Sequence, residues 1–128
     1  MLKIRELKVY IEDTETFHKK LSKDLKAIDR GEADTLSEDS ISFKSIDQLR
    51  KCLTEKRLEL IRVIRKKKPK SIYELAKMVS RKTENVNADI KLLHMWGFVH
   101  IDKVKDKRRR SVPKVNFDSI SLDLGLHR

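Results

Sequence analysis

Residues 71–97, SIYELAKMVSRKTENVNADIKLLHMWG, predict two helices separated by a short turn. Ser71 is a favourable N-cap for the first helix, and Glu74 three residues later completes a capping box. We expect Thr83 to cap the second helix and Gly97 to end it, because glycine adopts the left-handed conformation of a C′ residue at little cost. The predicted core between the two helices consists of Leu75, Ala76, Val79, Val86, Ile90 and Leu93. The small alanine in this set would let the helices approach closely.

The segments on either side extend this pattern. A helix from Glu55 to about Lys67 is predicted before the pair, with Thr54 as its N-cap, and Pro69 prevents its continuation. After Gly97 the apolar period changes from 3.6 to 2. Two alternating runs, 98–103 and 112–117, enclose the basic sequence KDKRRRS and predict a hairpin with a long loop.

The N-terminal part of the sequence predicts a strand followed by a helix. Alternation over Leu7–Ile11 predicts a strand, and Phe17, Leu21, Leu25 and Ile28 form the apolar stripe of a helix. An acidic linker follows, and then a short strand over 40–43 and a short helix over 46–53. The alternation of Ile120, Leu122 and Leu124 predicts a last strand. We therefore expect an α+β protein with an N-terminal strand–helix arm in residues 1–45 and a second domain in residues 46–128.

Positive charge is concentrated after residue 50. The chain has 128 residues, with 31 Lys and Arg against 20 Asp and Glu, a net charge of +11. Residues 1–50 sum to −1, residues 51–100 to +8 and residues 101–128 to +4. The densest runs are Arg62–Lys70 and Lys103–Arg110. This distribution predicts a polyanionic partner for the second domain.

Several classes of protein are disfavoured. The single cysteine, Cys52, excludes an intramolecular disulfide and is expected to be a buried apolar residue. Three glycines cannot build a Gly-rich phosphate loop. The histidines His18, His94, His100 and His127 are scattered, so we expect no metal site, no cofactor and no enzyme activity. We also expect no membrane span and no secretory signal, and a cytoplasmic location.

The order of helix, short helix, turn, helix and basic hairpin is that of a winged helix-turn-helix. Its second helix, about 83–96, would enter the major groove of DNA, and the wing, about 103–114, would grip the flanking backbone. The outer face of this helix carries Asn85, Asn87, Ala88 and Lys91, and the turn before it carries Arg81, Lys82 and Thr83. The predicted wing contacts are Lys107, Arg108, Arg109 and Arg110. These eleven residues are the predicted DNA-binding site.

Residues 49–117 resemble prokaryotic winged-helix transcription regulators, and in particular a small MarR-like family of DNA-binding proteins of archaea and bacteria. The resemblance rests on Thr-x-Lys-Arg-Leu-Glu-Leu at 54–60, Ser-Ile-x-Glu-Leu-Ala at 71–76, Asn-Val-x-x-Asp-x-Lys-Leu-Leu at 85–93 and Gly-Phe-Val at 97–99. It implies a winged helix and DNA binding. Asp89 departs from the polar or basic residue common in the wider class, so we expect it to have a structural role.

The expected function is transcriptional regulation, as a repressor, by a homodimer joined through Phe17, Leu21, Leu25 and Ile28. The alternative for this stripe is that its helix folds back on its own domain. One alternative is an antitoxin that autoregulates its operon while its N-terminal segment masks a toxin protein. A further alternative is a winged helix that binds RNA, since such proteins are equally basic.

Overall fold

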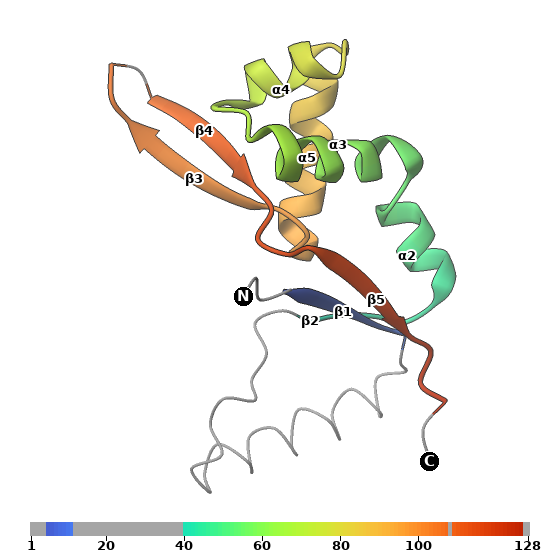
Figure 1. Cartoon of the computed structure of the whole chain (residues 1–128). Helices are drawn as coiled ribbons and strands as arrows, with labels where there is room; N and C mark the ends of the chain where they lie inside the picture. The colour runs from blue at the N-terminus through green and yellow to red at the C-terminus, as the bar shows by residue number, and fades with distance from the viewer. Residues whose placement is uncertain (1–4, 12–39, 108, 127–128) are drawn as a thin grey trace, which may run out of the picture. The chain divides into compact units, whose positions relative to one another are not determined.

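The computed structural model describes residues 5–11, 40–107 and 109–126 (Figure 1). It is an α+β structure in which the described residues form two compact units. Residues 5–11, 40–49 and 117–126 belong to the first unit, and Arg50–Asn116 form the second. We call them the sheet unit and the helix–hairpin unit. The predicted division at residue 45 thus differs from the structure, since the segment after Asn116 returns to the sheet unit through its pairing with the first strand.

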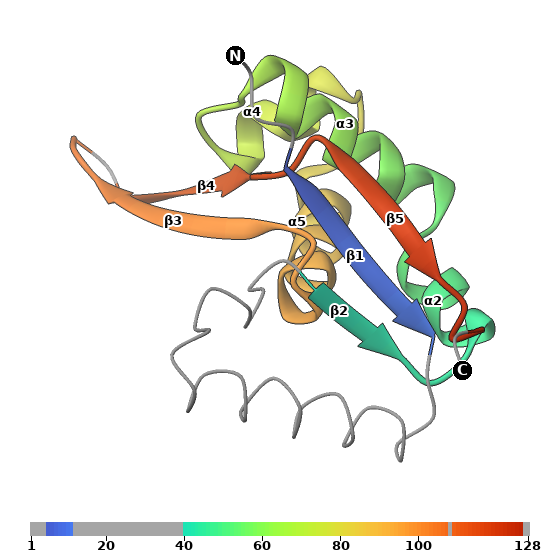
Figure 2. The ribbon, with the colours of Figure 1, turned by 60° about the horizontal axis from the view of Figure 1, so that its bottom comes forward.

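The sheet unit contains three parallel strands in the order β2-β1-β5, which Figure 2 shows side by side. They are β1 (Glu6–Ile11), β2 (Ser40–Phe43) and β5 (Ser119–Asp123). Val9 lies opposite Ile41 on one neighbour and Leu122 on the other. Leu7 and Val9 are buried on the same face, because alternate residues of a strand point the same way. The predicted strands are confirmed, whereas their parallel pairing was not predicted.

The short helix α2 (Ile46–Cys52) contains the division between the units. Ser45 directly precedes the helix, and its Oγ accepts a hydrogen bond from the Gln48 N–H at 3.1 Å. Its last residue, Cys52, is buried. The predicted helix over 46–53 is confirmed to within one residue.

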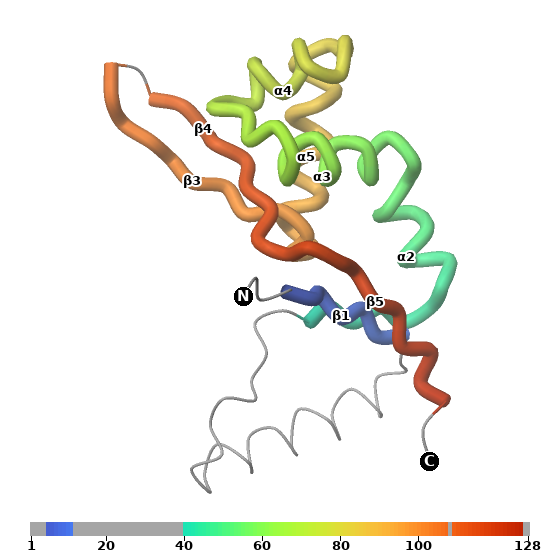
Figure 3. Tube along the Cα trace, viewed as in Figure 1, coloured from blue at the N-terminus to red at the C-terminus, as the bar shows by residue number. Residues whose placement is uncertain are grey.

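The helix–hairpin unit begins with three helices, whose path can be followed in Figure 3. They are α3 (Glu55–Lys67), α4 (Ile72–Met78) and α5 (Thr83–Trp96). Thr54 Oγ1 accepts from the Arg57 N–H at 3.3 Å, and Ser71 Oγ accepts from the Glu74 N–H at 3.0 Å. Both predicted N-caps are therefore confirmed. Gly97 has φ +95° and its N–H bonds to carbonyls of the last turn of α5, as a C′ glycine does.

The predicted N-cap of α5 is wrong by one residue. The cap is Lys82, whose backbone is extended and whose carbonyl accepts the N–H groups of Asn85 and Val86, both at 3.1 Å. Thr83 is already the first residue of the helix, because the first helical hydrogen bonds go to the Lys82 carbonyl. The side chain of Lys82 makes no capping hydrogen bond to the first N–H groups of α5.

The core of the helix–hairpin unit joins the three helices. Its buried members include Leu60, Ile64, Leu75, Ala76, Val86, Ile90, Leu93 and Phe98. Five of the six predicted core residues are in this set, and the sixth, Val79, is half-buried at the end of α4. The periodicity of the sequence located this core because it depends on which face of each helix is apolar.

The hairpin consists of β3 (His100–Lys105) and β4 (Arg109–Lys114), which pair antiparallel. Its loop is shorter than predicted, because Lys105 pairs with Arg109 and Val104 with Arg110. The ion pair between Arg110 and Asp106, at 3.1 Å, spans the loop. Arg109 and Arg110 are therefore strand residues. None of the helices formed by the described residues is long and apolar enough to cross a membrane.

Candidate functional site

Three elements of the helix–hairpin unit line one shallow, open hollow with a volume of about 410 Å³. The N-terminal end of α4, the N-terminal end of α5 and strand β4 contribute to it. Its lining residues are Ser71, Ile72, Tyr73, Thr83, Glu84, Asn87, Arg110 and Ser111. Three predicted site residues from two distant parts of the sequence, Thr83, Asn87 and Arg110, thus meet at one place.

Three of the four residues predicted on the outer face of α5 are exposed in the structure. Asn85, Ala88 and Lys91 are exposed, and Asn87 is half-buried at the hollow. The buried residues of the same helix, Val86, Ile90 and Leu93, lie on the opposite face. Lys82, Thr83, Lys107 and Arg109 are exposed as well. These side chains are accessible to a large ligand.

Arg81 is placed differently from its prediction as a DNA contact. Its Nη2 lies 2.8 Å from Asp89 Oδ2, and Arg57 Nε lies 3.1 Å from Asp89 Oδ1. All three side chains are largely buried, with the arginines 20% and Asp89 16% exposed. The guanidinium of Arg81 therefore neutralises a carboxylate inside the unit, and the predicted structural role of Asp89 is confirmed.

Arg57 is a residue to which sequence analysis assigned no role. Besides its bond to Asp89, its Nη1 donates to the carbonyls of Lys51 and Cys52, at 2.7 and 3.0 Å. It therefore links the end of α2 and the start of α3 to α5. The signal that could have found it is its place in the Thr-x-Lys-Arg pattern at residues 54–57.

Cys52, His94 and His100, the cysteine and histidines among the described residues, do not line the hollow. Cys52 is buried, as predicted, and burial raises the pKa of its thiol while the charge of Arg57 partly opposes this. The thiol is thus neutral and poorly nucleophilic near neutral pH. The His94 and His100 rings are 6.5 Å apart, with His94 Nδ1 at 3.0 Å from the Val99 carbonyl and His100 Nε2 at 2.9 Å from Asp102. Within the described ranges, no three His, Cys, Asp or Glu side chains are grouped as metal ligands.

Some predicted residues fall outside the part of the chain that the structure describes. Arg108 of the wing is one of them. The apolar stripe Phe17, Leu21, Leu25 and Ile28, predicted to join two copies, is another. The hollow is therefore defined without them.

The chain is an α+β protein with a basic helix–hairpin unit that presents an exposed polar helix face. The model of the HVO_A0114 family matches residues 52–122, more than half of the chain, so the chain belongs to this family. The match covers the helix–hairpin unit from Cys52 and continues into β5. Neither the curated proteins nor the solved structures contain a match to the chain.

Proposed function

We propose that the chain is a winged helix-turn-helix protein that binds double-stranded DNA and regulates transcription as a repressor. In this proposal α4 and α5 are the helix-turn-helix, α5 is the recognition helix, and β3 with β4 is the wing. The helices and the hairpin follow one another in the order that this class requires.

The observation that carries the proposal is the hollow at which Thr83, Asn87 and Arg110 meet. A recognition helix and a wing must face the same side of the unit if they are to touch one duplex. The major groove is about 12 Å wide and accepts a helix, whose outer face must then be polar and exposed. The exposed face of α5 has this character, with Asn85, Ala88 and Lys91.

The charge of the unit supports the same proposal. Residues 50–116 hold 21 Lys and Arg against 7 Asp and Glu, a net charge of +14. Cations that neutralise phosphates release counterions, and this supplies most of the non-specific affinity for DNA. Lys82, Lys107 and Arg109 are exposed and suited to phosphate contacts.

The polar residues of α5 would supply the sequence preference. An Asn side chain pairs with the adenine edge through two hydrogen bonds, Lys reaches guanine, and an Ala methyl contacts the thymine methyl. We assign base contacts to Asn85, Asn87, Ala88 and Lys91. Arg81 is left out of this set, because its guanidinium binds Asp89.

A repressor would gain affinity and register by binding two half-sites as a homodimer. The stripe Phe17, Leu21, Leu25 and Ile28 enters the proposal from the sequence alone. Such a stripe could serve as the interface of a homodimer or as the surface of an antitoxin that binds a toxin. Sedimentation of the full chain, alone and bound to DNA, separates the two.

The first test is binding of the full chain to fragments of its own genomic DNA, followed by affinity measurements on the selected duplex at several salt concentrations. The double variant Lys107→Ala/Arg109→Ala should bind every duplex more weakly and reduce the slope of log K against log salt by about two, one for each lost phosphate contact. Asn87→Ala should instead cost about 1–3 kcal/mol on the selected sequence and little on random DNA.

The matched control is Lys8→Ala/Lys44→Ala, which removes two exposed cations of the sheet unit. It changes the net charge by the same amount and should leave the salt slope unchanged. Equal slopes for the two double variants would overturn the assignment of the wing. Preference for a structured RNA over every duplex would overturn DNA as the partner.

A further inference from the structure

The helix α5, to which we assign the base contacts, begins without a capping side chain. The side chain of Lys82, its N-cap residue, makes no hydrogen bond to the first turn. Ser80, in the turn before α5, has φ +55°, a left-handed conformation that is uncommon for residues other than glycine. The N–H of Arg81 donates to the Ala76 carbonyl at 3.0 Å, which joins this turn to α4. The start of α5 is therefore fixed by contacts with other elements and not by a local cap.

Asp89, in the middle of α5, receives two further contacts of this kind. Its Oδ2 accepts a hydrogen bond from Arg81 Nη2 at 2.8 Å, and its Oδ1 accepts one from Arg57 Nε at 3.1 Å. Each carboxylate oxygen thus has its own arginine, one from the turn before α5 and one from α3. We call these three residues the ion cluster. Its side chains are at most 20% exposed, so water and salt screen the two ion pairs weakly.

The guanidinium of Arg57 makes the ion cluster directional. This group is planar, and its N–H donors point in fixed directions. While Nε of Arg57 binds Asp89, its Nη1 binds the carbonyls of Lys51 and Cys52, at 2.7 and 3.0 Å. A movement of α5 along or about its axis would lengthen the bond to Asp89. The ion cluster thus restricts the position of α5 relative to α3 more strictly than apolar packing, which has no preferred direction.

Arg81 and Asp89 enclose the part of α5 that carries Asn85, Asn87 and Ala88, three of the residues to which we assign base contacts. Arg81 itself is turned inward. Its Nη2 binds Asp89, and its Nη1 is buried with no hydrogen-bond partner among the described residues. The residues that hold this segment are therefore distinct from those that it offers to a ligand.

An ion cluster of this kind contributes more to geometry than to stability. Replacing a buried ion network by apolar residues of similar volume is often neutral or stabilising, whereas removing one partner is costly. What an apolar replacement cannot supply is the fixed direction of the hydrogen bonds. The property to test is therefore the position of α5, separately from the stability of the unit.

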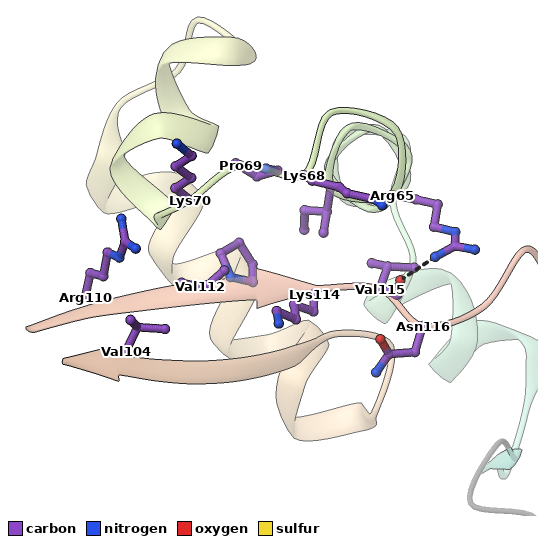
Figure 4. Close-up of a pocket in the computed structure, with 12 residues that line it drawn as sticks. Arg65, Lys68, Pro69, Lys70, Val104, Arg110, Val112, Lys114, Val115 and Asn116 are labelled. Atoms are coloured by element: carbon purple, nitrogen blue, oxygen red, sulfur yellow. Dashed lines mark hydrogen bonds between the residues drawn. The ribbon is translucent and has the colours of Figure 1, made fainter. Parts of the chain in front are cut away.

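A second arginine of α3 offers a comparison, because it is bonded to a different element. Arg65 Nη1 donates to the Val115 carbonyl at 3.3 Å, which Figure 4 shows as a dashed line. Val115 directly follows β4, so this bond joins α3 to the end of the hairpin. The helix α3 is thus bonded to α5 through Arg57 and to the hairpin through Arg65.

We propose that Arg57, Arg81 and Asp89 are positioning residues that set the sequence preference of α5 without touching DNA. This step rests on the proposed function. Hydrogen bonds to base edges weaken steeply when donor and acceptor are displaced or misaligned. A shift of α5 therefore impairs the contacts of Asn85 and Asn87 with bases, while the cations of the unit still attract the phosphates of any duplex. The ion cluster acts on the choice between sequences and little on the affinity for DNA in general.

The test measures sequence preference as the ratio of two affinities of the full chain, one for a duplex selected from genomic DNA and one for random duplex. The variant Arg57→Met/Arg81→Met/Asp89→Leu replaces the ion cluster by apolar side chains and should melt close to the wild-type temperature. Its preference should fall about tenfold, the equivalent of one lost base contact, while its affinity for random duplex changes little.

Arg81→Lys provides a second variant that keeps every charge of the chain. Lysine lacks the fixed fork of the guanidinium, so the preference should fall several-fold in a chain that folds as the wild type does. The matched control is Arg65→Met, which removes an arginine of the same helix and changes the net charge by the same amount as the triple variant. Its preference should equal that of the wild type. An unchanged preference in the folded cluster variants, or an equal fall in Arg65→Met, would overturn the proposal.

The position of α5 is measured without DNA, from residual dipolar couplings of backbone amides in α5 and α3. The angle between the two helices should change in the cluster variants and stay the same in Arg65→Met. A lower preference with an unchanged angle overturns positioning as its cause. A changed angle with an unchanged preference overturns the link to base contacts. A changed angle in a chain whose wild type prefers no duplex overturns the proposed function and supports the positioning of α5 alone.

Discussion

The sheet unit and the helix–hairpin unit differ in the sign of their net charge. Residues 50–116 carry a net +14, whereas the rest of the chain holds 10 Lys and Arg against 13 Asp and Glu, a net charge of −3. Large exposed apolar residues of the sheet unit include Leu122, Leu124 and Leu126, at 49%, 47% and 84%. Each of the two compact units thus offers a different chemistry.

The largest expected effect comes from removing apolar volume from the core of the basic unit. Leu93 is fully buried, so Leu93→Ala should destabilise the helix–hairpin unit by about 2–5 kcal/mol. Met95 on the same helix is 69% exposed, and Met95→Ala should change stability by about 0.5 kcal/mol or less. Denaturant unfolding measures both. If amide exchange in β1 is accelerated as much as in α5, the two units unfold together and their separation fails.

A smaller loss is expected from the buried ion cluster. Asp89→Asn removes the carboxylate that Arg57 and Arg81 share, which should cost about 2–3 kcal/mol. Asp47, in the first turn of α2, is exposed, so Asp47→Asn should cost well under 1 kcal/mol although it removes the same charge. Thermal unfolding of the two variants compares them. Similar losses would show that Asp89 acts through net charge alone.

The smallest expected effect is a pH dependence of the hairpin. Asp102 lies on β3, and the pKa of its carboxyl is lowered, chiefly by the hydrogen bond from Lys114 and further by His100. A lowered pKa stabilises the folded form above the ordinary Asp pKa of about 3.9, and this contribution is lost as the pH falls through the folded value. The side chain is exposed, so the effect is weak.

Asp102→Asn should therefore increase amide exchange of the β3–β4 pairs slightly at neutral pH and make no difference in strong acid. Asp123, on β5 of the sheet unit, supplies the comparison, and Asp123→Asn should leave exchange in the hairpin unchanged. A difference between wild type and Asp102→Asn that grows as the pH falls would contradict the assigned sign.

Local features were predictable from the sequence, and long-range ones were not. The caps at Thr54 and Ser71 and the end of α5 at Gly97 depend on residues within four positions, so a short motif specifies them. The burial of Val86, Ile90 and Leu93 follows from helical periodicity. The predicted Thr83 cap was misplaced because Lys82 has no side-chain signature for the role it takes.

The candidate site was predictable in part, for the same reason. The outer face of α5 follows from its buried face, and this gave Asn85, Asn87 and Lys91. Nothing local indicates that Arg81 binds Asp89, or that Arg57, 32 positions from Asp89, joins them. The convergence of Arg110 with Asn87 depends on the register of the hairpin, which the long predicted loop had left unspecified.

The pairing of β1 with β5 has a consequence for the order of folding during synthesis. The Arg5 N–H bonds to the Asp118 carboxylate across 113 positions, and Glu6 lies opposite Ser119. The ribosome therefore synthesises β1 long before β5, its second neighbour in the sheet. The helices α4 and α5 are close in sequence, so their contacts can form before β5 is synthesised. Contacts between residues this distant in sequence form slowly, so the helix–hairpin unit should fold first. The pairing of β5 with the earlier synthesised β1 should then follow.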